Sequence, residues 1–385
     1  MITREEFEEY CDEHELKYEI YYNIFTNSSL RKHWNNDNLF IILCSYGCLE
    51  TIKWLYSLGN INIHKKNEKA FRLCCVSGHL EVAKWLIEIS KESGKIINIH
   101  AKNDDAFIYS CFQGYKEIAE LLIKISKENG KIINIHKNNE RVFRICCGDG
   151  QIEVAKWLIE ISKENGEMIN IHANNEKAFR ESCIWGRKEI AKWLLEISKE
   201  NGEIINIHTI EKEFIRSCRN GNIEMAKWLV EISKENGEKI NIHAKNEKAF
   251  RDSCILGRSL EVLKWLIKIS QENGEMINIH AKNEEAFRKS CNNDSLKVVK
   301  WLIKISKENG NMINIHANNE EAFRKSCKFY NIKTAKWLCS LCDEYYIEIK
   351  DNKIVKYGIK NMYDKFLNEN FGITKIIKKL QLKII

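Results

Sequence analysis

Cysteine and histidine, two residue types that bind metals and carry out redox or acid–base chemistry, recur at regular spacing along this 385-residue chain. In nine successive segments a cysteine follows a phenylalanine by four residues, and in eight of them a tryptophan follows that cysteine. The cysteines are Cys44, Cys75, Cys111, Cys147, Cys183, Cys218, Cys254, Cys291 and Cys327. Eight of the 11 histidines lie between the segments, at His64, His100, His136, His172, His208, His243, His280 and His316.

These rows are poorly suited to metal binding. Equivalent atoms of successive packed helix pairs lie about 8–10 Å apart, whereas zinc ligands lie about 2.0–2.3 Å from the ion. We therefore expect no metal site. We interpret the histidines as rings that hydrogen-bond the backbone of connecting hairpins rather than as metal ligands or pH sensors. The same distance argument predicts that the cysteines are small buried apolar residues.

The remaining motifs give no catalytic constellation. Cys339 and Cys342 form a C-x-x-C, but no second pair follows at zinc-site spacing and no βαβ pattern surrounds them, so we interpret them as a helical pair. The sequence has no glycine-rich phosphate loop, no H-E-x-x-H and no serine–histidine–aspartate order. We therefore predict a protein without enzymatic activity and without a cofactor.

Each repeated segment has the pattern of two helices. In the copy that begins at Asn67, this asparagine is a good N-cap. Phe71 and Cys75 then share one helix face, and Gly78 suits a left-handed helix end. A second helix follows with a wide apolar stripe that includes Trp85. Because one such pair cannot bury both of its faces, it needs stacked neighbours, and the rings are expected to form a continuous aromatic core.

The second helix is predicted to be one turn longer in units two to eight than in the first unit. Nine residues separate Trp85 from Gly94, whereas five separate Trp54 from Gly59. Four added residues make close to one helical turn, so the buried face keeps its direction. The connector that follows, "IINIH", alternates β-branched and polar residues and is expected to form a short strand in an extended linker or hairpin.

The sequence "AFRLCCVSGHLEVAKWL", which begins at Ala70, resembles the ankyrin repeat consensus. Cys74 and Cys75 fall on its small pair, and "GHLEV" from Gly78 matches almost letter for letter. Alanine replaces the motif proline, Arg72 replaces its histidine, and the repeat is 36 residues long in most copies rather than 33. The richness in Lys, Asn and Ile is similar to that of ankyrin-repeat proteins of giant DNA viruses of the mimivirus type.

The resemblance implies an all-α ankyrin-type repeat solenoid of about nine helix-turn-helix units with short β-like connectors over residues 36–345. We expect residues 1–35 to form an acidic N-terminal cap and residues 346–385 to form a basic C-terminal cap or tail. The tail sequence "GITKIIKKLQLKII" is amphipathic as a helix. It is expected to pack on the last unit, or to bind a partner or an anionic membrane surface.

The resemblance also implies a surface that binds a protein partner, on the concave face of the solenoid. In ankyrin proteins this face is lined by the residues between the small pair and the glycine. Those carried over are Val76, Ser77, Phe112, Gln113, Asp149, Ile184, Trp185, Arg219, Asn220, Ile255 and Leu256. Trp185 lies off the repeated tryptophan position, and we expect it to anchor a partner together with Phe112, Ile184, Ile255 and Leu256.

Composition narrows the partner classes. The net charge of +7 is spread thinly over the middle of the chain, so we expect a protein partner and no nucleic acid. Apolar runs are too short for a membrane span, and the start lacks the order of a signal peptide. We expect an intracellular, cytoplasmic monomer, in the host cytoplasm if the protein is viral. The alternatives are an RNA-binding helical-repeat protein and a membrane-surface scaffold that uses the basic tail.

Overall fold

The computed structural model describes residues 2–14, 18–26, 34–235, 237, 239–255 and 260–360. The chain divides into two compact units, Met1–Ile205 and Asn206–Ile385, and each is described by itself. None of the helices in the described part of the chain is long and apolar enough to cross a membrane.

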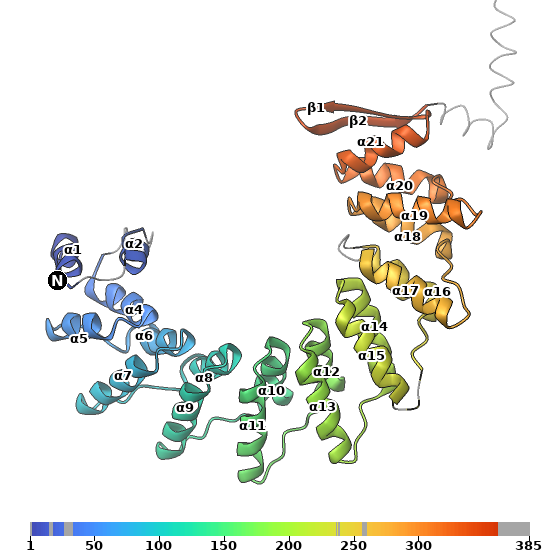
Figure 1. The fold of residues 1–385 in the computed structure, drawn as a ribbon. Coiled ribbons are helices and arrows are strands. Elements are labelled where there is room, and N and C mark those ends of the chain that lie inside the picture. Colours follow the sequence, from blue (N-terminus) through green and yellow to red (C-terminus); the bar gives the residue numbers. More distant parts are fainter. Residues whose placement is uncertain are drawn as a thin grey trace, which may run out of the picture. The chain divides into compact units, whose positions relative to one another are not determined.

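The first unit is a stack of antiparallel helix pairs behind two N-terminal helices (Figure 1). The first helices of the pairs, α4, α6, α8, α10 and α12, pack against one another. They lie on the inner side of the curve of this unit, and the second helices lie on its outer side. The bounds are α1 Arg4–Glu13, α2 Tyr18–Thr26, α4 Asn36–Tyr46, α5 Leu49–Ser57, α6 Lys65–Val76, α7 Leu80–Glu92, α8 Ala101–Gln113, α9 Lys116–Glu128, α10 Lys137–Asp149, α11 Ile152–Glu164, α12 Ala173–Ile184 and α13 Lys188–Glu200.

The second unit repeats the same helix pairs and ends in a β-hairpin. Its inner helices α14, α16, α18 and α20 again pack in sequence. The bounds are α14 Ile207–Asn220, α15 Ile223–Glu235, α16 Ala244–Ser253, α17 Leu260–Glu272, α18 Ala281–Asn292, α19 Leu296–Glu308, α20 Ala317–Lys328, α21 Ile332–Leu341, β1 Tyr345–Lys350 and β2 Lys353–Ile359. The hairpin is an addition to the all-α prediction.

The repeated phenylalanines and cysteines form the core of both units. All nine phenylalanines, from Phe40 to Phe323, are at most 1% exposed, and the nine cysteines are equally buried. The eight repeated tryptophans are less buried: Trp157 and Trp228 are 7% and 5% exposed, and the other six are half-buried. Where ring contacts form, the tryptophan of one repeat meets the phenylalanine of the preceding one, as Trp193 meets Phe143 at 6.3 Å between centroids. The core is therefore a phenylalanine column with tryptophans along its edge, rather than an evenly buried aromatic core.

The predicted extra turn in the second helices is confirmed. Helix α5 has nine residues, whereas α7, α9, α11, α13, α15, α17 and α19 each have 13. A serine in the added turn is fully buried in each of these helices. Ser162 shows its role, because its hydroxyl donates to the carbonyl of Ile159 at 2.7 Å and accepts the N–H of Ile169 at 3.3 Å. The added turn thus holds the connector that follows it.

The connectors differ from the prediction in two respects. Burial alternates along them, with Ile97 and Ile99 buried between exposed neighbours, but none of the described connector residues belongs to a strand. Asn67 is not an N-cap: Lys66, Asn67 and Glu68 all have positive φ, between 55° and 57°. The same left-handed turn recurs in six other repeats. Asparagine suits it because its short polar side chain tolerates this region of backbone space.

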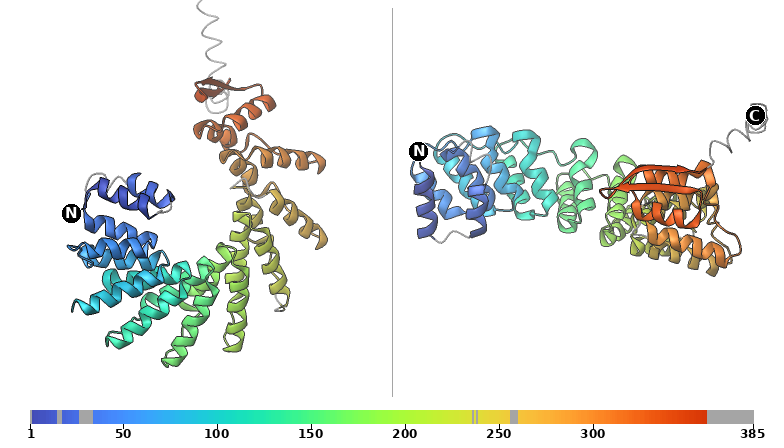
Figure 2. Two further views of the ribbon diagram at one scale, coloured as in Figure 1. Left: turned by 60° about the vertical axis from the view of Figure 1, so that its left-hand side comes forward. Right: turned by 90° about the horizontal axis from the view of Figure 1, so that it is seen from above.

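Different elements cover the two ends of the described chain (Figure 2). At the start, Tyr10 of α1 stacks on Trp54 of the first pair, with centroids 3.7 Å apart. At the other end, Tyr345 of β1 stacks on Phe323 of α20 at 4.1 Å and an interplanar angle of 4°. The antiparallel strands are joined by Asp351 and Asn352, both at positive φ, as a two-residue hairpin turn requires. Residues 361–385, with the predicted amphipathic tail, lie outside the described residues.

Candidate functional site

The predicted partner-binding residues lie at the carboxyl ends of the inner helices. Val76, Phe112, Asp149 and Ile184 occupy the last two residues of their helices and are half-buried. Ser77 and Gln113 lie at the same level, the first half-buried and the second exposed. In the second unit, Arg219 and Asn220 are exposed at the end of α14, and Ile255 is half-buried. Leu256 lies outside the described residues.

Among the predicted anchors that the structure describes, Trp185 is the most exposed. It is the C-cap residue of α12, and 63% of its surface is exposed. A Cβ atom built on Gly148 would lie 3.7 Å from Cδ1 of Trp185, so the indole rests against the surface of α10 at this glycine. Arg187 fixes the same junction by donating from Nε to the carbonyl of Gly148 at 3.3 Å. The side chain is therefore held between two repeats while most of it faces solvent.

An aromatic pair with one exposed member lies on α8. Tyr109 and Phe112 pack edge to face with centroids 6.2 Å apart, and Tyr109 is 45% exposed. The first unit thus presents aromatic groups at α8 and α12, on its inner helices. Ile255 belongs to the second unit, so the patch predicted to combine it with Trp185 remains a prediction.

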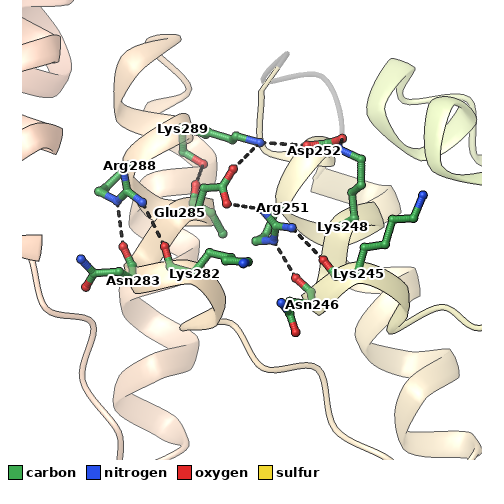
Figure 3. A network of polar contacts seen from close by, with 12 residues as sticks. Lys245, Asn246, Lys248, Arg251, Asp252, Lys282, Asn283, Glu285, Arg288 and Lys289 are labelled. Carbon is green, nitrogen blue, oxygen red and sulfur yellow. Dashed lines mark hydrogen bonds and ion pairs between the residues drawn. The ribbon is translucent and has the colours of Figure 1, made fainter. Parts of the chain in front are cut away.

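An arginine ladder on the inner helices was not predicted. In the copy at Arg251, Nε donates to the carbonyl of Asn246 at 2.6 Å and Nη2 to that of Lys245 at 2.9 Å. These carbonyls belong to the left-handed turn, so the guanidinium satisfies a strained backbone segment. Its Nη1 pairs with Glu285 of the next repeat (Figure 3). Arg288 makes the same contacts with Asn283, Lys282 and Glu321, and Arg72 pairs with Asp105.

Lysines extend the ladder in the second unit. Lys289 lies 2.8 Å from Asp252 and 2.7 Å from Glu285, so one ammonium joins two repeats. Burial would raise the pKa of Asp252, but hydrogen bonds from Lys289 and Lys248 outweigh it and lower this pKa. At Glu321, burial likewise raises the pKa, but contacts with Lys325, Asn318 and Arg288 outweigh it and lower the pKa to about 2. The ladder is thus an internally neutralised network, which leaves these charges poorly available to a ligand.

The connector histidines contact carboxylates rather than the predicted hairpin backbone. Nδ1 of His136 lies 3.0 Å from Glu140, four residues later, and the same pair recurs at six other described histidines. The backbone N–H of His136 donates to Oδ1 of Asn134 at 2.8 Å, so the histidine closes the connector through both groups. The side chain of His208 lies outside the described part. Within that part, no group of three or more histidine, cysteine, aspartate or glutamate residues could hold a metal ion.

Comparison with known proteins identifies the repeat. Residues 39–132 and 107–209 match the family model for ankyrin repeats in three copies. Residues 39–209 are therefore built of ankyrin repeats. No curated protein matches the sequence. The human ASB11 ankyrin repeat domain is a similar solved structure, with 16% identity over 55% of this chain and 95% of that chain and a TM-score of 0.37. The similarity to giant-virus proteins stays a prediction, since neither match concerns a virus.

The ankyrin frame explains the buried chemistry-bearing residues. The prediction that the nine repeated cysteines are buried is confirmed. Burial raises the pKa of Cys254 and of Cys327 to about 12, so these thiols stay protonated and weakly nucleophilic. Cys339 lies in α21, but Cys342 is the extended residue after this helix, so the predicted helical pair is only half helical. Ankyrin repeats are generally protein–protein interaction modules without catalytic activity.

Proposed function

We propose that this chain is a non-enzymatic scaffold that binds a protein partner on the inner helices of its first unit. The observation that carries the proposal is Trp185, a rigid aromatic side chain held against α10 and 63% exposed. Interfaces take much of their binding energy from such aromatic anchors. Holding the indole before binding reduces the side-chain entropy that association costs.

The neighbouring surface supports a protein ligand. Tyr109 and Phe112 add a second aromatic group on α8. Tyr109 and Trp185 are both exposed on the inner helices of the first unit, and exposed aromatic groups gathered on one face are typical of an interaction surface. The charged ladder beside them alternates in sign, which does not suit a polyanion such as RNA.

Affinity capture from cell lysate tests the proposal. The intact chain is compared with W185A and with I204A, whose isoleucine is 75% exposed in a connector and serves as a matched loss of surface apolar area. We expect W185A to lose bound protein and I204A to retain it, with unchanged circular dichroism in both. Equal capture by W185A and the intact chain would show that this surface does not bind the partner. Recovery of RNA that is lost at raised salt would favour the nucleic-acid alternative.

A further inference from the structure

Arg144 of α10 is one copy of the ladder arginine and has the same pose as Arg251 and Arg288. Its Nε donates to the carbonyl of Asn139 at 2.7 Å and its Nη2 to that of Asn138 at 3.0 Å. Both carbonyls belong to the left-handed turn of its own repeat. Two edges of the guanidinium are therefore occupied as they are at Arg251 and Arg288.

The third edge of the Arg144 guanidinium, at Nη1, lacks the partner that three other copies have. At Arg72, Arg251 and Arg288, Nη1 pairs with a carboxylate that lies two residues before the phenylalanine of the next repeat. At Arg144 that place is taken by Lys177, two residues before Phe179. Among the described residues, no carboxylate lies within ion-pair distance, 4.0 Å, of Arg144. The ladder is thus open at Arg144, whose other two contacts are kept.

The charge order on the facing helix is reversed. On α18 the acid precedes the lysine, with Glu285 and Lys289 2.7 Å apart, and this order places the acid against Arg251. On α12 the lysine precedes the acid, with Lys177 and Glu181 3.7 Å apart. Glu181 still attracts Arg144 electrostatically, but burial is the larger effect and lowers the pKa of the guanidinium. Arg144 is therefore a cation that is only 9% exposed and lacks a close internal counter-ion.

The open guanidinium lies beside the proposed anchor. Arg144 and Gly148 are one helical turn apart on α10 and share a face. Trp185 and the side chain of Glu181 both rest against Gly148, so the indole, the Glu181 carboxylate and the free edge of Arg144 belong to one surface between α10 and α12. Gly148 has no side chain where Phe112 and Ile184 stand in the neighbouring repeats.

We propose that Arg144 binds a carboxylate of the protein partner, from an Asp or Glu side chain whose apolar neighbour packs on Trp185. The partner carboxylate would take the place that Glu285 and Glu321 hold against Arg251 and Arg288 in the second unit. This inference rests on the proposed function and specifies the chemistry of its partner. A guanidinium presents its donors in a planar fork that matches a carboxylate, and its partial burial strengthens the pair.

The surroundings favour one carboxylate over a phosphate backbone. The carboxylates of Glu181 and Glu140 and the cation Arg141 all act on Arg144, and burial raises the pKa of Asp149 against the opposing effect of Arg187. Acidic neighbours of this kind repel a ligand with several negative charges, whereas a single carboxylate can be accommodated at the arginine. This mixed pattern of charges suits an isolated carboxylate of a peptide better than the continuous negative charge of RNA.

The test uses the full chain and a displayed library of random peptides. Peptides are selected on the unaltered protein and on the charge-swapped variant K177E/E181K. This variant gives Arg144 the acid-before-lysine arrangement of α18, so it should fold normally and close the site. We expect the selected peptides to contain an Asp or Glu near an apolar residue. Replacement of that acid by its amide, or use of the variant, should weaken binding about tenfold to a hundredfold.

The outcomes separate the inference from the proposed function. Peptides that bind the unaltered protein and K177E/E181K equally but are lost with W185A would overturn the carboxylate site and leave the interaction surface in place. If no peptide is selected on the unaltered protein, both the inference and the proposed surface fail. Binding of a poly(A) RNA probe that K177E/E181K weakens, with no acidic preference among peptides, would replace the partner class by nucleic acid.

Discussion

The arginine that replaces the motif histidine makes this ankyrin repeat unusual at the level of single residues. In the copies at Arg251 and Arg288 it satisfies two carbonyls of a three-residue left-handed turn and pairs with the next repeat. A left-handed conformation costs roughly 1–2 kcal/mol per residue for residues other than glycine. Three contacts hold this turn in the copy at Arg251: the arginine itself, the pair of His243 with Glu247, and the connector residue Asn241, whose Oδ1 accepts the N–H of His243.

The first prediction concerns this arginine. R251A should lower the free energy of unfolding by about 2–4 kcal/mol, because it frees two strained carbonyls and leaves Glu285 without its partly buried partner. R324A is the matched control, since Arg324 stands at the same position of the last repeat and is exposed there. Urea unfolding followed by circular dichroism should show little change for R324A. Equal losses in both variants would rule out the ladder as the cause.

The second prediction concerns acid stability. The folded-state pKa of Glu321 is about 2 against an ordinary value of 4.5. The contacts of its carboxylate with Lys325 and Arg288 therefore contribute stability above pH 4.5, and this stability is lost as the pH falls toward 2. E321Q should therefore be less stable than the unaltered protein at neutral pH, and the two should converge near the acid end. Thermal unfolding measured across this pH range checks it. A difference that stays constant with pH would show that charge at Glu321 is not responsible.

At the scale of elements, the helix lengths could be predicted because they depend on local spacing. The distance from Trp85 to Gly94 sets the length of α7. Phe71 and Cys75 mark the buried face of α6, the first helix of the same pair. The left-handed turn could not be distinguished from an N-cap, since asparagine suits both. The ladder was missed because Arg251 and Glu285 are 34 residues apart and meet only after two repeats stack. Its signal was present as an acid two residues before each phenylalanine that follows a paired arginine.

The candidate surface was predictable only in part. Trp185 was singled out because it breaks the repeated tryptophan frame, and it is the most exposed of the anchors in the described part of the chain. The open edge of Arg144 was not predictable from periodicity alone, because Lys177 looks like any surface lysine until its equivalence to Glu285 is seen. The connector strands were expected from the alternation of residue types. Burial does alternate along the connectors, but none of their described residues forms a strand.

The third prediction tests the serine that ties the added helical turn to the connector. S162A should lower the free energy of unfolding by about 1–3 kcal/mol, because the buried N–H of Ile169 loses its acceptor. S340A is the control, since Ser340 makes the same bond within its helix, to Trp337 at 2.6 Å, but is exposed. Amide hydrogen exchange at Ile169 should accelerate in S162A alone. Unchanged exchange there would mean that the connector is held by its own isoleucines.

At the scale of the whole molecule, a repeat at an end of the described chain lacks the neighbour that covers the core rings of the other repeats. In a solenoid a repeat gains stability from the interfaces with its neighbours, so an end repeat needs a different cover. Trp54 of the first pair is covered by Tyr10, and Phe323 of the last pair by Tyr345. In other repeats, as at Phe250 and Trp301, the next repeat supplies the covering ring.

The last prediction is that Tyr345 seals the second unit by its ring. Y345A should expose Phe323, lower the melting temperature and increase self-association, because an uncovered apolar repeat end can stack on another copy. Y345F keeps the stacked ring and loses only the hydroxyl, which contacts Glu320 and lies 3.2 Å from His316. Its free energy of unfolding should therefore fall by about 1 kcal/mol. Differential scanning calorimetry and light scattering distinguish the two variants. If Y345F associates as strongly as Y345A, the polar contact rather than the ring closes the stack, and capping by aromatic cover is wrong.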